Sequence, residues 1–292
     1  MSRRGWVLFI SLSIIWGIPY LMIRVAVESL SPWFVVFARV AIGAAILLPI
    51  AAARGELKQL RGYLGWIAVF AVVEIMITWP AVTFAEQHLT SSFTALMISA
   101  VPLVAALIAV RLGLDRFTGT RLLGLFIGIA GVAALVGLDF GEIYLPSVVL
   151  LMITVVGYAF GPVVISQRLV GVPSMGVIAV SLLINTVVFA PFAIATRPTE
   201  PVPAQAWWCV VLLGVVCTAI AFIFFFQLVN EVGPARMTVI TYLNPVVALF
   251  LGVLLLGEAI TTGMIVGFPL VLIGSWLATR KGVPEEADPV PM

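Results

Sequence analysis

Ten apolar stretches, each about 20 residues long and separated by short polar or turn-rich breaks, restrict the fold of this chain more than any other feature. A helix rises about 1.5 Å per residue, so about 20 apolar residues cover the hydrocarbon core of a bilayer. With 63% apolar and 10% charged residues, the chain has too little polar surface to enclose a soluble core. We therefore predict an all-α membrane protein with ten transmembrane helices. The predicted spans are residues 6–27, 33–53, 63–85, 90–112, 120–138, 146–167, 175–195, 206–229, 235–256 and 262–279.

The chain also repeats itself at a constant offset. The segment "SAVPLVAALIAVRLGLDRFT" at 99–118 aligns without a gap on "YLNPVVALFLGVLLLGEAIT" at 242–261, and Pro102 falls on Pro245. An offset of about half the chain indicates one structural unit that is present twice. We predict two five-helix repeats and a disordered cytoplasmic tail, at residues 1–142, 143–280 and 281–292.

Lysine and arginine are distributed unevenly between the two sides of the predicted membrane. If the chain starts in the cytoplasm, twelve of its fifteen lysines and arginines lie in cytoplasmic segments, two lie outside, and Arg39 lies within the second span. An excess of these residues marks cytoplasmic loops, so we predict that both termini are cytoplasmic. Because each repeat has an odd number of spans, the second crosses the membrane in the opposite sense. The repeats are therefore expected to be inverted.

The segment "GVVCTAIAFIFFFQLVNEVGPARMTVITYLNPVVALFLGVLLLGEAITTGMIVGFPLVLIGSWL" resembles the second half of EamA-type members of the drug/metabolite transporter superfamily. The first half carries a weaker similarity in "IIWGIPYLMIR" and "SSFTALMISAVPLVAAL". The resemblance covers residues 6–280. It implies the drug/metabolite transporter fold, with ten helices in two inverted five-helix repeats that move a small metabolite by alternating access. The length and the aromatic-rich interior resemble the YddG-type exporters of aromatic amino acids.

Prolines inside the predicted spans are candidate hinges. A proline within a helix removes an amide donor and displaces the carbonyl four residues earlier. In transporters such breaks offer backbone groups to substrate near the middle of the membrane. We predict hinges at Pro102 and Pro245, which correspond in the repeat, and at Pro19 and Pro162 in the first span of each repeat. The alternative is that these prolines only kink helices for packing.

Polar residues near the start of the ninth span form a second candidate group. Met237, Thr241 and Asn244 share one helical face, and a buried amide is costly unless it is paired. This face is suited to bind the backbone of an amino acid. An interhelical hydrogen bond from Asn244 is an equally supported interpretation.

Glu74 is the acidic residue nearest the middle of a predicted span. A carboxylate at the bilayer centre costs about 2.5 to 3.5 kcal/mol on insertion scales, which favours a functional role. Glu74 would bind a substrate ammonium group or take up a proton in each cycle. The structural alternative is an acid that is protonated or paired with Arg39.

Aromatic side chains near mid-span complete the candidate site. Trp16 and Tyr20 share a face at positions i and i+4, and Trp79, Tyr158 and Tyr242 also lie at or near mid-span. Rings that line a pocket bind flat apolar ligands by offset stacking and hold cations against their faces. Most aromatic residues in such a chain face lipid or the membrane interface instead. Thr78, between Glu74 and Trp79 in the chain, is included in the predicted substrate-binding set.

The sequence also indicates what the protein lacks. It contains no glycine-rich phosphate loop and no metal-ligand spacing, and its single histidine, His88, has no acid and nucleophile nearby in sequence. The basic residues form no patch that would favour nucleic acid. We therefore expect no enzymatic activity, no cofactor and no metal.

Together these features predict a secondary transporter in a bacterial inner membrane, surrounded by lipid and either monomeric or homodimeric. The expected activity is export of small amphipathic metabolites, most of all aromatic or other apolar amino acids. One alternative is a broad efflux carrier for organic cations or drugs, with Glu74 as the counter-charge. An alternative of another class is a membrane sensor or lipid-handling protein that transports nothing, although a sensor does not need two symmetric halves.

Overall fold

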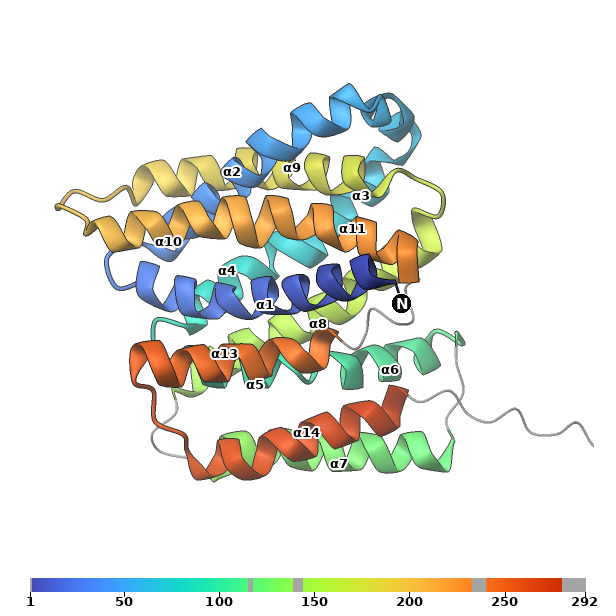
Figure 1. The fold of residues 1–292 in the computed structure, drawn as a ribbon, viewed down its shortest axis with the longest axis vertical. Helices are drawn as coiled ribbons and strands as arrows, with labels where there is room; N and C mark the ends of the chain where they lie inside the picture. Colours follow the sequence, from blue (N-terminus) through green and yellow to red (C-terminus); the bar gives the residue numbers. More distant parts are fainter. Residues whose placement is uncertain (1, 115–117, 139–143, 233–239, 280–292) are drawn as a thin grey trace, which may run out of the picture.

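The computed structural model describes residues 2–114, 118–138, 144–232 and 240–279, and in these ranges every regular element is a helix (Figure 1). The elements of the first half are α1 (Arg3–Ala26), α2 (Pro32–Ala53), the 3-10 helix η1 (Glu56–Tyr63), α3 (Leu64–Ala71), the π-helical segment η2 (Val72–Met76), α4 (Thr78–Ala85), α5 (Ser91–Ile98), α6 (Val101–Arg111) and α7 (Gly119–Gly137). Those of the second half are α8 (Leu145–Arg168), α9 (Ser174–Ala195), α10 (Ala204–Gly214), the π-helical segment η3 (Val215–Ile220), α11 (Ala221–Val232), α13 (Ile240–Leu256) and α14 (Thr262–Thr279).

The predicted all-α membrane fold is confirmed. Among the described residues, nine helical spans are long and apolar enough to cross a bilayer, and α13 is a further apolar helix of 17 residues. The third span begins at Glu56 rather than at the predicted residue 63, because the amphipathic η1 continues into α3. The predicted repeat boundary at residue 142 and the tail at 281–292 lie outside the described residues.

The helices pack in a pattern that follows the repeat. Along one edge of the molecule α7 lies against α14, and along the opposite edge α2 lies against α9 (Figure 1). Between these edges α1 contacts α10, α11 and α13, whereas α8 contacts α3, α4, α5 and α6. The sequence offset that aligns Pro102 with Pro245 also aligns α1 with α8. The same offset aligns the helices that contact α8 with the helices that contact α1. Equivalent elements therefore make equivalent contacts.

Glycines bring α7 and α14 into backbone contact. A methyl group added to Gly131 would lie 2.6 Å from the amide nitrogen of Val271, and one added to Gly267 would lie 2.6 Å from the carbonyl oxygen of Gly131. Gly124 similarly faces the backbone of α14. Only residues without a side chain allow helices to approach this closely. The glycines thus allow α7 and α14 of the same chain to pack backbone against backbone.

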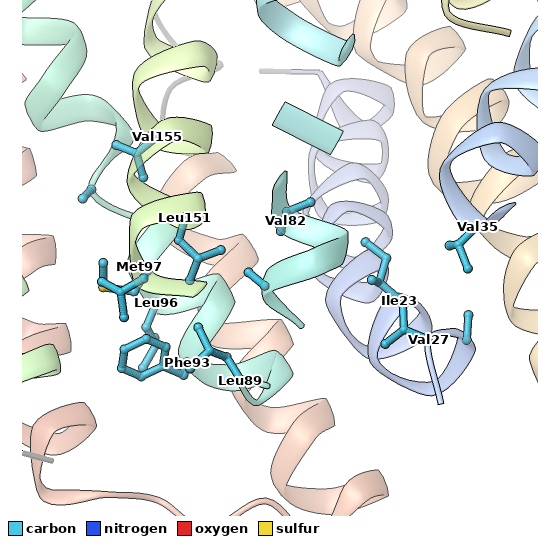
Figure 2. Close-up of a cluster of buried hydrophobic side chains, with 14 of the residues drawn as sticks. Ile23, Val27, Val35, Val82, Leu89, Phe93, Leu96, Met97, Leu151 and Val155 are labelled. Atoms are coloured by element: carbon cyan, nitrogen blue, oxygen red, sulfur yellow. The ribbon is translucent and has the colours of Figure 1, made fainter. Parts of the chain in front are cut away.

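We call the end of the bundle where α1 begins the near end, and the opposite end the far end. The cluster of apolar side chains in Figure 2 joins the far-end parts of helices from both repeats. The labelled members are Ile23, Val27, Val35, Val82, Leu89, Phe93, Leu96, Met97, Leu151 and Val155.

Three of the predicted spans are not regular helices. The fourth is broken into α5 and α6 by a turn at Ser99 and Ala100. The third and eighth contain the π-helical segments, and in η2 the amide of Ile77 bonds the carbonyl of Val72, five residues earlier, at 3.0 Å. The segments begin at Val72 and Val215, which are separated by the same offset as the two repeats. Both repeats therefore carry the same irregularity at the same position, and π-turns are frequent at functional sites.

Candidate functional site

A buried arginine lies at the centre of the candidate site. The guanidinium carbon of Arg39, on α2, lies 3.8 Å from the ring centre of Trp79, on α4. Its Nε donates a hydrogen bond of 3.1 Å to Oγ1 of Thr218, in η3. Tyr20 of α1 and Tyr158 of α8 lie within electrostatic range of the same guanidinium. We call these five residues the arginine cluster, and they come from both repeats.

The π-turn in η3 places Thr218 against Arg39. The Thr218 hydroxyl donates to the carbonyl of Leu213, five residues earlier, at 2.8 Å, so its oxygen accepts from Arg39. One turn beyond Arg39, Gly43 lets α2 run close to η3, because a methyl group there would lie 2.8 Å from Cγ2 of Thr218. Thr218 itself is fully buried. The irregular helix and the glycine together fix the distance between the two side chains.

Arg39 has no carboxylate partner among the described residues. The ion pair found there is between Arg54 and Glu56, at 3.9 Å, near the start of η1. Arg39 is 8% exposed, and its bond to Thr218 leaves both terminal nitrogens without a hydrogen-bond partner in the described part of the chain. A buried charge is costly unless it is paired, and the Trp79 ring offsets only about 2 kcal/mol of that cost. The arrangement is suited to receive an anion.

Glu74 lies beside the arginine cluster but is not paired with Arg39. Its carboxylate packs against Gly161 of α8, where a methyl group would overlap it. Oε2 is buried without a hydrogen-bond partner among the described residues, and Tyr158 lies within electrostatic range. Arg39 instead contacts Trp79. The predicted structural pairing of the two residues is therefore not observed.

Thr78 links η2 and α4 to α8. Its hydroxyl donates to the backbone carbonyl of Glu74, and its own carbonyl accepts from Oγ1 of Thr154 at 3.3 Å. Gly157 of α8 faces Thr78 closely enough that a methyl group could not be added. Thr78 is fully buried, so its observed contacts position the backbone between Glu74 and Trp79.

Glu86 is a candidate residue that the sequence analysis missed. It follows α4 directly, is fully buried, and neither carboxylate oxygen has a hydrogen-bond partner among the described residues. Arg39 and Tyr20 lie within electrostatic range of it. Its position at the end of a predicted span made it resemble a loop residue. Glu86 is seven residues after Trp79, a spacing that puts the two side chains on one helical face. This spacing could have identified Glu86 from the sequence.

Trp16 packs on α11, and Pro102 marks a helix break, whereas the other predicted hinge prolines lie in continuous helices. The Trp16 ring lies 5.3 Å from that of Phe225 and 6.3 Å from that of Phe222, both on α11. Pro102 lies in the first turn of α6, directly after the break at Ser99 and Ala100. The prolines within continuous helices are Pro19 in α1, Pro162 in α8 and Pro245 in α13.

The predicted residues of the ninth span join α13 to its neighbours. The side-chain amide of Asn244, oriented to satisfy its surroundings, donates to the carbonyl oxygens of Ser13 (3.1 Å) and Ile240 (3.0 Å). The Tyr242 hydroxyl lies 3.1 Å from Oγ1 of Thr279, on α14. Asn244 thus makes the interhelical bond of the alternative interpretation, and Tyr242 does not join the arginine cluster. Thr241 is half-buried on α13, and Met237 lies outside the described residues.

Two small hollows lie away from the arginine cluster. The first is between α6, α7 and α14, and the second is between the near-end parts of α8, α9 and α11. Neither is lined by a member of the arginine cluster. Neither hollow therefore provides a path to Arg39 in the described part of the chain.

Comparison with known proteins places this geometry in a family of transporters. The model of the EamA-like transporter family matches twice, at residues 3–137 and 145–280. An uncharacterized inner membrane transporter of Escherichia coli strain K12, YedA, is 29% identical over 289 residues, covering 94% of this chain and 92% of that protein. A probable terminal-alkyne amino-acid exporter of Streptantibioticus cattleyicolor is 25% identical, covering 96% and 95%.

A solved crystal structure shares the fold. It aligns with a TM-score of 0.67 and 22% identity, covering 96% of this chain and 97% of that one. The family and the names of the relatives indicate a transporter rather than an enzyme. The repeated match, the transmembrane helices and the shared fold lead to one assignment: the chain belongs to the EamA-like transporter family and is a multi-pass membrane transporter.

Proposed function

We propose that this protein is a secondary transporter of a bacterial inner membrane that exports aromatic and other apolar amino acids by alternating access. The observation that carries the proposal is Arg39, buried between α2, α4 and η3 without a carboxylate partner among the described residues. A guanidinium binds a carboxylate through two parallel hydrogen bonds, which suits the one group that all amino acids share. The names of an inner membrane transporter and an amino-acid exporter among the relatives support this location and substrate class.

The surroundings of Arg39 favour an apolar side chain on the substrate. Trp79 covers one face of the guanidinium, and Tyr20 and Trp16 follow on one face of α1. Phe222 and Phe225 extend this aromatic surface on α11. Rings at such spacing offer stacking and apolar area but no hydrogen-bond donor for an acidic side chain. Broad selectivity follows, because apolar pockets separate ligands that differ by one methylene by only about 1 to 3 kcal/mol.

The alternative of an organic-cation efflux carrier has one observation in its favour. Glu74 and Glu86 both have buried carboxylate oxygens without partners among the described residues, and either is a possible counter-charge. Arg39, however, would repel a cation that entered the same cluster. A purely sensory protein has less support, since equivalent contacts in both repeats provide the two matched halves that alternating access requires.

The test is phenylalanine flux in proteoliposomes that contain only this protein. Arg39→Gln removes the charge and should lower flux at least about tenfold, equivalent to about 1.4 kcal/mol. Arg39→Lys keeps the charge but loses the planar fork, so an intermediate flux is expected. The matched control is Arg197→Gln, which removes an exposed far-end arginine and should leave flux unchanged. Thermal stability in detergent shows whether each variant is folded.

Competition distinguishes the two classes of substrate. Unlabelled tryptophan and leucine should inhibit phenylalanine flux, whereas a quaternary ammonium compound should not. Transport of the quaternary ammonium compound by a protein that ignores phenylalanine and tryptophan would contradict the proposal and support the efflux carrier. Absence of flux for every compound, with folded protein in the vesicles, would contradict both transport assignments.

A further inference from the structure

Glu86 is a buried carboxylate that no contact of the described residues explains. Its side chain is fully buried at the junction between α4 and α5, and both carboxylate oxygens lack hydrogen-bond partners there. Arg24, the nearest arginine along α1, donates from Nη1 to the backbone carbonyl of Glu86 at 3.3 Å. A carboxylate removed from water without hydrogen bonds costs far more than a paired one, which argues against a role in stability alone.

The groups around Glu86 are few, and their roles differ. Those within electrostatic range are Arg24, Arg39, Tyr20, Tyr158 and Glu258. Glu258 is occupied, because it accepts hydrogen bonds from the backbone amides and hydroxyls of Ser91 and Ser92 at the start of α5.

Arg39 and Glu86 are thus two buried groups of opposite charge type that lie within electrostatic range of one another and are not paired. In the described residues, no ion pair joins them within 4.0 Å. A helix advances about 10 Å over the seven residues from Trp79 to Glu86, so Glu86 follows two turns after the ring that contacts Arg39. Tyr20 lies within electrostatic range of both charges. A ligand that carries an ammonium group and a carboxylate on one carbon atom would pair with Glu86 and Arg39 at the same time.

We propose that Glu86 binds the α-ammonium group of the substrate while Arg39 binds its carboxylate. The inference rests on the proposed function and adds a specificity: the site recognises the zwitterion. Glu74 is not equivalent, because its carboxylate packs against Gly161 of α8. A site that pairs a substrate group discriminates strongly against analogues without that group, because the buried partner is then left alone.

Three ligands test this assignment: phenylalanine, 3-phenylpropionate, which lacks the ammonium group, and phenethylamine, which lacks the carboxylate. Each unlabelled ligand competes with labelled phenylalanine in proteoliposomes. The unsubstituted protein should prefer phenylalanine to 3-phenylpropionate at least about tenfold. In Glu86→Gln this ratio should fall to about one, because phenylalanine loses its partner and 3-phenylpropionate does not. In Arg39→Gln the preference for phenylalanine over phenethylamine should fall instead.

Two further variants separate recognition from folding. Glu86→Asp keeps the charge on a shorter chain and should restore part of the ratio lost in Glu86→Gln. Glu28→Gln removes an exposed far-end carboxylate and should leave the ratio unchanged.

An unchanged ratio in Glu86→Gln, or equal loss for phenylalanine and 3-phenylpropionate in a folded protein, would overturn the assignment of Glu86. That result would leave amino-acid export intact. Failure of the unsubstituted protein to transport phenylalanine would instead overturn the proposed function itself.

Discussion

At the scale of single residues, Glu74 shows how a helix irregularity places a polar group. It lies within η2, and the turn of the π-helical segment directs its carboxylate at Gly161 of α8. Oε2 is buried there without a hydrogen-bond partner among the described residues, close to Tyr158. A group this costly to bury is more readily explained by a change of charge or contact during transport than by packing.

We therefore expect Glu74→Gln to insert and fold normally but to lower phenylalanine flux at least about tenfold. Glutamine keeps the shape of the side chain and cannot ionise. Flux in proteoliposomes across a range of pH, together with thermal stability in detergent, measures both effects. Glu200→Gln, at an exposed position, is the control. Normal flux at every pH would make Glu74 a structural residue.

The sequence identified single residues where polarity was unusual, but it did not identify their partners. Glu74 and Arg39 were recognised because charges are rare inside apolar spans. Thr218 was missed, because a hydroxyl in an apolar helix is common and bonds the backbone of its own helix. The spacing of Thr241 and Asn244 predicted a shared helical face, but it did not indicate that Asn244 would bond α1. Which helices are neighbours is a property of the fold.

At the scale of elements, the contact between α7 and α14 depends on the absence of side chains. Gly274 packs so closely on the backbone of Gly124 and Gly128 that no methyl group fits without moving a helix. Along α7, Gly137 has open space around its Cα instead. The two positions differ in packing but not in residue type, which makes them a matched pair.

Gly274→Ala should lower the thermal stability of the purified protein, because overpacking costs about 1 to 3 kcal/mol and the neighbouring atoms here belong to the backbone. Gly137→Ala should be neutral or slightly stabilising, since alanine favours a helix over glycine by about 1 kcal/mol. Unfolding temperatures in one detergent measure the difference. Equal unfolding temperatures for both variants would show that α7 and α14 accommodate a methyl group without loss of stability.

Spans were predictable as elements, whereas their irregularities were not. Length and apolarity predicted the number of spans, because both follow directly from the thickness of the membrane. Pro102 and Pro245 occupy equivalent positions in the two repeats, yet a helix break precedes Pro102 and a continuous helix runs through Pro245. Proline frees a carbonyl in both helices, and the neighbouring helices decide whether the chain turns or only bends.

At the scale of the whole molecule, the orientation in the membrane is a prediction from charge. With cytoplasmic termini, a reporter that is active only in the cytoplasm should work when fused after Lys281 and fail when inserted at Glu142. The reason is that five spans separate the N-terminus from residue 142. Activity at Glu142 with none at Lys281 would reverse the orientation without changing the fold.

The pairing of helices across the molecule was largely implied by the repeat. The offset that relates the repeats also relates the contacts of α1 with α10, α11 and α13 to those of α8 with α3, α4 and α6. The sequence did not indicate that the arginine cluster would draw Arg39 from one repeat and Thr218 from the other. That juxtaposition depends on how the repeats face each other, which no spacing within a single repeat encodes.

The two π-helical segments set the rotational register of the helices that carry the neighbours of Arg39. Each residue of an α-helix turns the chain by about 100°, and a π-turn holds one residue more than an α-turn between bonded groups. If η2 tightened into regular helix, everything after it would revolve by about that angle, and Trp79 and Glu86 would swing away from Arg39 together. Tightening of η3 would likewise turn Thr218 from the same guanidinium. The extra residue in each π-turn thus determines which side chains of η3 and α4 face Arg39.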